Sequence, residues 1–498
     1  MSFRNVYGRR RFLGSASLLA VSIAATSPTH ATPTHTYELI AEFELGSTLQ
    51  PCPGIAINNR GDVAYQTDEP TVVDGHPDRL VKTYVRLAGE AAPRLIHAGS
   101  TLFGSVDIAK PLTNNEAHLR CGDVNNRPLG INGNSIVTIP VHWITQSGST
   151  DVQEVGYQLV DPNGTLVGNG IRGIATTSGR LNLSLQMAGT RSEAGPLRVT
   201  DGVTTTSTQI LGTPGFFQPI INNNGAAAAL GTGPGGLTLT FVDPSNPLSP
   251  LGRTLGQFSG GRWYTDSRQL GFNDLNWMSF ASNADNNNSA QDVGPRILQI
   301  SPDGQDYLVA DTTKWDGIFA NFYQGRFGPY GTSLNNFNRV LFAAARAAVT
   351  PDVGSGSDSL WVGDASGLKP VLALDSQEVI IVDGGRRFTG FGLTPDGRGV
   401  TTNSLNDKGD LLFLVSASEV TPNQPGGQLT GLFVAHPVTG IEPGTPVIPG
   451  GGPIAGRRLG IHWRKFSIPL RRCSRVLHSL CGSSCRRGLR VQDDAGGR

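Results

Sequence analysis

The chain has 498 residues, including 65 Gly and 32 Pro, with only 16% charged residues and a formal net charge of +1. This length allows two to four ordinary domains or one large repeat architecture. The high Gly and Pro content predicts many turns and few long helices. Most of the basic excess lies at the two ends, so the body is acidic and lacks the basic footprint that nucleic-acid binding requires.

The first 31 residues have the pattern of an export signal. The run from Gly8 to Gly14 (G-R-R-R-F-L-G) is similar to the S-R-R-x-F-L-K pattern of twin-arginine translocase substrates, with Gly in place of Ser and Lys. The apolar stretch 13–25 is too short for a permanent membrane helix, and Thr29 and Ala31 form a cleavage site after residue 31. We expect export by the twin-arginine route; the alternatives are an ordinary secretory signal or a retained anchor.

Residues 37–43 alternate polar and apolar side chains, as a half-buried strand does. An Asn then recurs in one context, which is clearest in residues 57–65 (I-N-N-R-G-D-V-A-Y). The seven copies are centred on Asn58, Asn132, Asn182, Asn222, Asn273, Asn335 and Asn406. Their mean spacing is about 58 residues, somewhat longer than the repeats of common propellers.

The motif predicts a tight turn that leads into a buried strand. Asn hydrogen-bonds its own backbone, and a Gly or Asn three residues later accepts a positive φ. A short apolar run follows each turn. In the third copy Leu183 and Ser184 replace the turn residues, which puts that blade in doubt.

A second signal follows each motif, consisting of a strand, a hairpin turn and in most copies a further strand. The predicted turns lie at Ala88-Gly89, Asp161–Gly164, Asp201-Gly202, Asp243-Pro244, Pro302–Gly304, Ser366-Gly367 and Thr439-Gly440. Each unit therefore has three to four short strands, which is the content of one propeller blade. We expect residues 37–43 to complete the last blade and close the ring, so that no sheet edge is left exposed.

The predicted fold is all-β, a β-propeller of residues 32–440, with seven blades favoured over six or eight. Tandem β-sandwiches would need repeats nearer about 100 residues. A solenoid would need shorter and more regular repeats.

The repeats resemble those of a family of exported bacterial β-propeller-like proteins, recognised by a Φ-N-[N/D]-x-G-x-Φ-Φ-F motif. The similarity covers roughly residues 37–440. Members often end in a surface-sorting tail, but the apolar sorting helix is missing from this chain. The resemblance implies no particular reaction or ligand.

Residues 441–498 begin as a flexible Pro/Gly linker and continue as a basic tail. Residues 456–498 contain eleven Lys or Arg and two Asp. One interpretation is an arm that contacts anionic polymer or lipid. The interpretation we favour is a disordered tail or a translated out-of-frame stretch.

No catalytic, cofactor or metal motif occurs in the sequence. The six His of the body are His35, His76, His97, His118, His142 and His436, without metal-ligand spacing. The loop from Asp285 to Asp292 has side chains with oxygen ligands at alternating positions, as calcium loops do. It lacks the Gly and the Glu of a calcium loop, so we expect an Asn-rich surface loop. Cys52 and Cys121 are the only Cys of the body, and whether they pair stays open.

The sequence therefore predicts a non-enzymatic binding or scaffold protein of the periplasm, cell surface or medium. We expect a monomer without a transmembrane helix in the mature chain, with a polysaccharide or an envelope protein as the ligand. The alternative is a carbohydrate-active hydrolase or lyase with paired carboxylates near the propeller axis. A channel lined by Asn, Ser and backbone would favour binding, whereas clustered carboxylates or His would favour the enzyme.

Overall fold

A computed structural model describes residues 34–438, except for residues 74, 102–116, 123–126, 148–149, 192–194, 209–212, 215–218, 234–235, 247–250, 255–261, 264–269, 286–293, 323–331, 347–357, 393–399 and 422–423. The chain divides into the units Met1–Pro449 and Gly450–Arg498, and every described residue belongs to the first. The predicted signal (1–31) and tail (441–498) lie outside the described residues. No helix with the length and hydropathy of a membrane span occurs in the described part.

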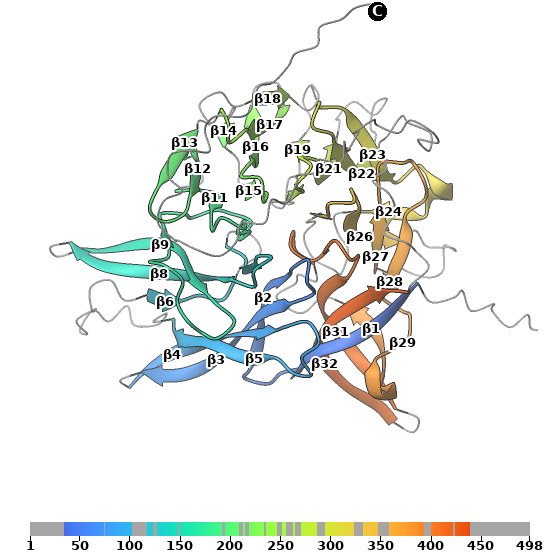
Figure 1. Cartoon of the computed structure of the whole chain (residues 1–498). Coiled ribbons are helices and arrows are strands. Elements are labelled where there is room, and N and C mark those ends of the chain that lie inside the picture. Colours follow the sequence, from blue (N-terminus) through green and yellow to red (C-terminus); the bar gives the residue numbers. More distant parts are fainter. Residues whose placement is uncertain are drawn as a thin grey trace, which may run out of the picture. The chain divides into compact units, whose positions relative to one another are not determined.

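The described part is all-β, with seven antiparallel sheets and two short 3₁₀ turns at Trp315–Gly317 and Asp383–Gly385. The sheets follow one another around a common axis in chain order (Figure 1). The innermost segments of adjacent sheets contact each other, for example β2 with β7 and β20 with β25. The predicted seven-bladed β-propeller is therefore confirmed.

The first four blades follow the chain directly. Blade 1 contains β2 (Gln50–Ile57), β3 (Val63–Val73), β4 (His76–Arg86) and β5 (Arg94–Ser100). Blade 2 contains β6 (Ala117–Leu119), β7 (Gly130–Ile131), β8 (Val137–Ser147), β9 (Thr150–Val160) and β10 (Ile171–Arg172). Blade 3 contains β11 (Met187–Thr190), β12 (Leu197–Thr200) and β13 (Thr205–Thr208). Blade 4 contains β14 (Thr213–Pro214), β15 (Ile220–Ile221), β16 (Ala227–Gly233), β17 (Gly236–Val242) and β18 (Leu251–Thr254).

The last three blades include the closure of the ring. Blade 5 contains β19 (Arg262–Trp263), β20 (Gly271–Phe272), β21 (Met278–Asp285), β22 (Gly294–Ile300) and β23 (Asp306–Asp311). Blade 6 contains β24 (Phe319–Asn321), β25 (Ser333–Leu334), β26 (Val340–Arg346), β27 (Asp358–Gly363) and β28 (Val371–Asp375). Blade 7 contains β29 (Ile380–Ile381), β30 (Arg387–Gly392), β31 (Leu411–Thr421), β32 (Gln424–Pro437) and β1 (His35–Glu44).

The ring closes as predicted, with the N-terminal strand β1 completing the last blade. β1 pairs antiparallel with β32, from His35 opposite Pro437 to Glu44 opposite Leu429 (Figure 1). The hairpin predicted at Thr439-Gly440 lies outside the described residues, and β1 takes the outer position in that sheet. The edge of β32 is thereby covered.

The core lies between adjacent blades. Val81 of blade 1 belongs to one buried cluster with Val141 and Trp143 of blade 2. β31 starts with five consecutive buried residues, which is typical of a strand covered on both faces. Apolar runs after the motif turns therefore form the interior of the ring wall.

Candidate functional site

The seven Asn motifs form seven equivalent turns at the inner ends of the blades. In each turn the amide N–H three residues after the Asn donates to the Asn carbonyl oxygen, as Gly409 does to Asn406 at 3.1 Å. The fourth position has a positive φ in every copy, namely in Gly61, Ser135, Leu185, Gly225, Asn276, Asn338 and Gly409. In all seven copies the side-chain Oδ1 of the Asn also accepts backbone N–H groups of its own turn.

The third copy, which was the doubtful one, forms the same turn. Leu185 takes φ +60° and donates its N–H to the carbonyl oxygen of Asn182 at 3.1 Å. Leu181 forms an isolated bridge with Met187, the first residue of β11. Blade 3 therefore exists. The Gln186 N–H donates to Asn182 Oδ1 at 2.8 Å, as the equivalent N–H does in the other copies, and Leu185 takes the positive φ in place of Gly or Asn.

The motif Asn residues also connect neighbouring blades. In six turns the Nδ2 group donates to the backbone carbonyl of the next motif Asn around the ring, at 2.9–3.2 Å. The exception is Asn182, whose Nδ2 donates to Gln186 Oε1 at 3.0 Å. The Asn ring, defined as these seven residues, is thus interrupted between blades 3 and 4. Its members are turn formers and inter-blade links at once.

A second set of side chains surrounds the axis one residue later in the motif. We call Asn59, Asn223, Asp274, Asn336 and Asp407 the polar arc. Asn336 Nδ2 donates to both Asp274 Oδ2 and Asp407 Oδ2 at 2.9 Å. Asn223 donates to Asp274, and Asn59 donates to Asp407. Blades 2 and 3 have Gly133 and Leu183 at this position, so the arc leaves an open sector there.

An axial cavity of about 360 Å³ lies inside these turns. It is lined by the turns of blades 1, 2, 6 and 7 and by Arg180, Leu181, Leu183, Asn223, Thr402 and Asn403. Two of these side chains reach blades that are not adjacent to their own. Asn403 Nδ2 of blade 7 donates to the Ser178 carbonyl of blade 3 at 3.3 Å. Arg180 Nη1 of blade 3 donates to the Phe272 carbonyl of blade 5.

The carboxylates of the polar arc accept hydrogen bonds from neighbouring turns. Burial raises the pKa of Asp274, but the positive charge of Arg180 and hydrogen bonds from Asn223 and Asn336 outweigh burial and hold that pKa below its usual value. Asp274 Oδ1 accepts the Asn223 N–H at 2.8 Å, and Asp407 Oδ1 accepts the Asn336 N–H at 2.8 Å. Both carboxylates therefore join one turn to the next.

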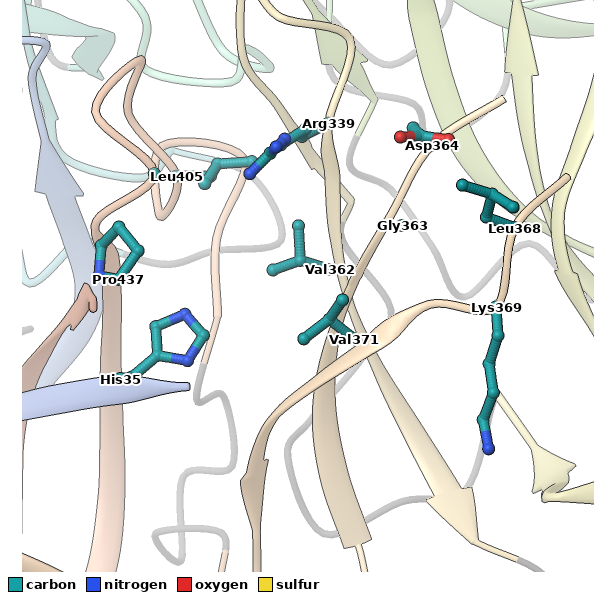
Figure 2. A pocket seen from close by; sticks show the side chains of 11 residues that line it. His35, Arg339, Val362, Gly363, Asp364, Leu368, Lys369, Val371, Leu405 and Pro437 are labelled. Carbon is teal, nitrogen blue, oxygen red and sulfur yellow. The ribbon is translucent and has the colours of Figure 1, made fainter. Parts of the chain in front are cut away.

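A smaller pocket of about 140 Å³ lies between blades 6 and 7. Figure 2 shows His35 and Pro437 on the blade 7 side and Val362 and Val371 on the blade 6 side. Burial and the neighbouring His436 lower the pKa of His35 to about 4. Arg339, Asp364 and Lys369 line the same pocket, so it combines charged side chains with apolar ones.

The structure separates the His of the body into different places, away from the axial cavity. His35 and His436 lie on the paired strands β1 and β32. His118 and His142 lie opposite each other on β6 and β8, and His142 contacts the guanidinium of Arg120 at 3.1 Å. In the described residues no group of His, Cys, Asp and Glu has the arrangement of a metal site.

Cys52 of blade 1 and Cys121 of blade 2 form a disulfide, which settles the question that the sequence left open. The bond links the first repeat to the second, across 69 residues of chain. The loop proposed as an Asn-rich surface segment, Asp285 to Asp292, lies outside the described residues except for Asp285 at the end of β21.

Arg180 and Asn403 are the cavity residues that sequence reasoning missed. Arg180 lies two residues before the motif Asn, where the other copies have Ala, Gly, Ile, Gly, Ser and Ser. Asn403 lies three residues before its motif Asn. A charged residue at a position that is otherwise small or apolar was the available signal for Arg180.

No family model and no curated protein matches this chain. Among solved structures, the chain is similar to the AtxE2 isopeptidase, with 8% identity over 80% of this chain and 54% of that chain and a TM-score of 0.24. The chain thus spans about half the length of the isopeptidase.

Two further structures are similar. The β-propeller domain of the Trilobed protease from Pyrococcus furiosus is 11% identical over 76% of this chain and 94% of that domain, with a TM-score of 0.26. The α-L-arabinofuranosidase Arb93A from Fusarium graminearum is 9% identical over 81% of this chain and 97% of that chain, with a TM-score of 0.22. The assignment of seven blades to this chain rests on its own strand pairing.

Proposed function

We propose that this protein is an exported, non-enzymatic binding protein that holds a saccharide in its axial cavity. The observation that carries the proposal is the lining of that cavity, which consists mainly of Asn side chains, turn backbone, some Leu and Ile side chains and the guanidinium groups of Arg60 and Arg180. A volume of about 360 Å³ lies within the range of small-molecule sites.

The lining offers both hydrogen-bond donors and acceptors. Asn223 and Asn403 use their Nδ2 groups within the protein, and neither Oδ1 accepts a bond from the described residues. Arg180 donates to a single described acceptor, so the other N–H groups of its guanidinium form no hydrogen bond within the described residues. A sugar hydroxyl both donates and accepts, and it is therefore matched by amide oxygens beside guanidinium N–H groups.

The carboxylates near the axis give no support to the alternative of a hydrolase or lyase. A glycosidase needs one carboxyl group with a raised pKa to act as the general acid. Asp274 has a lowered pKa and accepts bonds from Asn223 and Asn336. Asp407 is engaged in the same way by Asn59 and Asn336. These groups serve as links between turns.

Export is the second part of the proposal. It rests on the twin-arginine pattern of residues 8–14 and is supported by the Cys52–Cys121 disulfide. Disulfides persist in oxidising compartments such as the periplasm and the extracellular space.

The test is calorimetric titration of the purified chain with neutral and acidic oligosaccharides, after a screen on a saccharide array. Asn403→Leu places an apolar side chain in the cavity and is expected to abolish binding. Asn163→Leu changes an exposed turn residue outside the cavity and is the matched control. Thermal unfolding by circular dichroism verifies that both variants fold. Saccharide binding that survives Asn403→Leu, or no saccharide binding at all, would contradict the proposal.

A further inference from the structure

Two arginines line the axial cavity, namely Arg60, which pairs with Asp62 at 3.0 Å, and Arg180. Arg180 is the only charged residue at its position among the seven motifs. Its side chain starts in blade 3, lines the cavity and reaches the Phe272 carbonyl of blade 5. The guanidinium is thus held beside the axis by one backbone acceptor.

This guanidinium forms no ion pair with a carboxylate of the described residues. The nearby Asp274 is already satisfied, because its two oxygens accept three hydrogen bonds from Asn223 and Asn336. A guanidinium has five N–H donors in a rigid fork, and the Phe272 carbonyl engages only one of its nitrogens. The remaining donors are available to a ligand in the cavity.

We propose that Arg180 binds the carboxylate of an acidic saccharide, so that the ligand carries a uronic acid unit at the propeller axis. This inference rests on the proposed saccharide-binding function and names its substrate class. The planar fork of a guanidinium matches a carboxylate in a two-point contact. The amide groups of Asn223 and Asn403 then face the neutral hydroxyls of the same sugar.

The surroundings favour an isolated carboxylate over a densely charged polyanion. Asp407 carries negative charge at the cavity wall, and Asp274 lies beside Arg180. The body of the chain is acidic as well. A ligand with many closely spaced anions would meet repulsion from these groups, whereas one carboxylate directed at Arg180 would not.

The experiment compares galacturonate with galacturonate methyl ester, which has nearly the same shape without the single negative charge. We expect the acid to bind the wild-type chain about tenfold more tightly or better, as one charge-assisted contact provides. In Arg180→Gln the two ligands are expected to bind equally, because the positive charge that distinguishes the acid from the ester is gone. Arg387→Gln replaces an exposed arginine of β30 and is expected to retain the preference. Arg180→Lys keeps the charge but loses the fork, and we expect an intermediate preference.

The outcomes separate the two proposals. Equal binding of acid and ester to the wild type overturns the proposal that Arg180 binds a carboxylate, but it remains consistent with saccharide binding. A preference that persists in Arg180→Gln also overturns it. If neither ligand nor any neutral saccharide binds, both proposals fail. Tighter binding of galactose 1-phosphate than of galacturonate would show that Arg180 recognises a phosphate, and it would overturn the assignment of a carboxylate. If Arg180→Gln does not fold, the Arg180→Lys measurement decides, and an undiminished preference there overturns the proposal.

Discussion

Asn406 and Asn58 are separated by 348 residues in the chain, and the Nδ2 of Asn406 donates to the backbone carbonyl of Asn58 at 3.1 Å. The bond joins the turn of the last blade to the turn of the first. It closes the inner side of the ring, while the pairing of β1 with β32 completes blade 7 on its outer side. The two closures are made by different parts of the chain.

The first prediction concerns these turns. Asn406→Ala removes the bond to Asn58 and the 2.9 Å bond from the Asp410 N–H, and it is expected to cost about 1–3 kcal/mol of unfolding free energy. Gly409→Val is expected to cost about 1–3 kcal/mol, because a β-branched residue is strained at φ +84°. Thermal and urea unfolding measure both losses.

The equivalent changes in blade 1, Asn58→Ala and Gly61→Val, are expected to have the same direction. Asn163→Ala, in an exposed turn, is the control and is expected to leave the unfolding midpoint unchanged. Gly409→Asn is expected to lose less than Gly409→Val, since Asn tolerates positive φ. Four unchanged melting curves for the turn variants would refute the structural role of the motif.

The second prediction concerns the disulfide between blades 1 and 2. The pair of substitutions Cys52→Ala and Cys121→Ala is expected to lower the unfolding free energy by about 2–4 kcal/mol, because the bond closes a long loop in the unfolded chain. Urea unfolding of the oxidised wild type and of the double variant gives the difference. A strong reductant is expected to lower the stability of the wild type alone. Two reactive thiols at these positions in the oxidised protein would disprove the pairing.

The third prediction is a loss of stability at alkaline pH. His436 Nδ1 lies 2.9 Å from Asp410 Oδ1, and its Nε2 lies 3.4 Å from Glu38 Oε2. Hydrogen bonds to these carboxylates raise the pKa of His436 from 6.5 to about 9. Stabilisation by the imidazolium is therefore complete below pH 6.5 and is lost as the pH rises through 9. We expect His436→Gln to flatten this alkaline decline in the urea midpoint.

His35 has the opposite dependence on pH. Burial, together with the charge of His436, lowers the pKa of His35 to about 4. The stability linked to its neutral form is complete above pH 6.5 and is lost as the pH falls through 4. His35→Gln is expected to reduce the acid decline and leave the alkaline one. Identical pH profiles for the wild type and both variants would contradict these assignments.

The fourth prediction concerns export. Replacing Arg9 and Arg10 by Lys is expected to keep the precursor in the cytoplasm, because the twin-arginine route depends on that pair. Cell fractionation and immunoblotting locate the chain, and the same change at Arg4 is the control. Normal export of the double variant would exclude the twin-arginine route.

The periodic features of the fold were predictable from the sequence, because each is encoded locally. A positive φ was indicated by the Gly or Asn that lies three residues after the motif Asn in five copies, namely those of Asn58, Asn222, Asn273, Asn335 and Asn406. The alternation of polar and apolar side chains in residues 37–43 predicted the strand that closes the ring. The turn at Leu185 was harder to predict, because a Leu rarely adopts the positive φ of +60° that this position takes.

The features of the cavity were less predictable, because they depend on what meets at the axis. Asn403 and Ser178 are 225 residues apart and belong to blades 7 and 3. Their contact follows from the ring geometry and has no local sequence signal. For the same reason, the sequence indicated only a turn residue at the position directly after the motif Asn. In the structure, Asp274 and Asp407 occupy this position and link neighbouring turns.

The antiparallel pairing of β1 with β32 also determines how the protein responds to force. His35 lies opposite Pro437, so the chain enters and leaves this strand pair at the same end. Tension applied between the two ends of the chain therefore peels the pair apart one hydrogen-bonded step at a time, starting at His35. Such unzipping needs little force compared with shearing a whole strand.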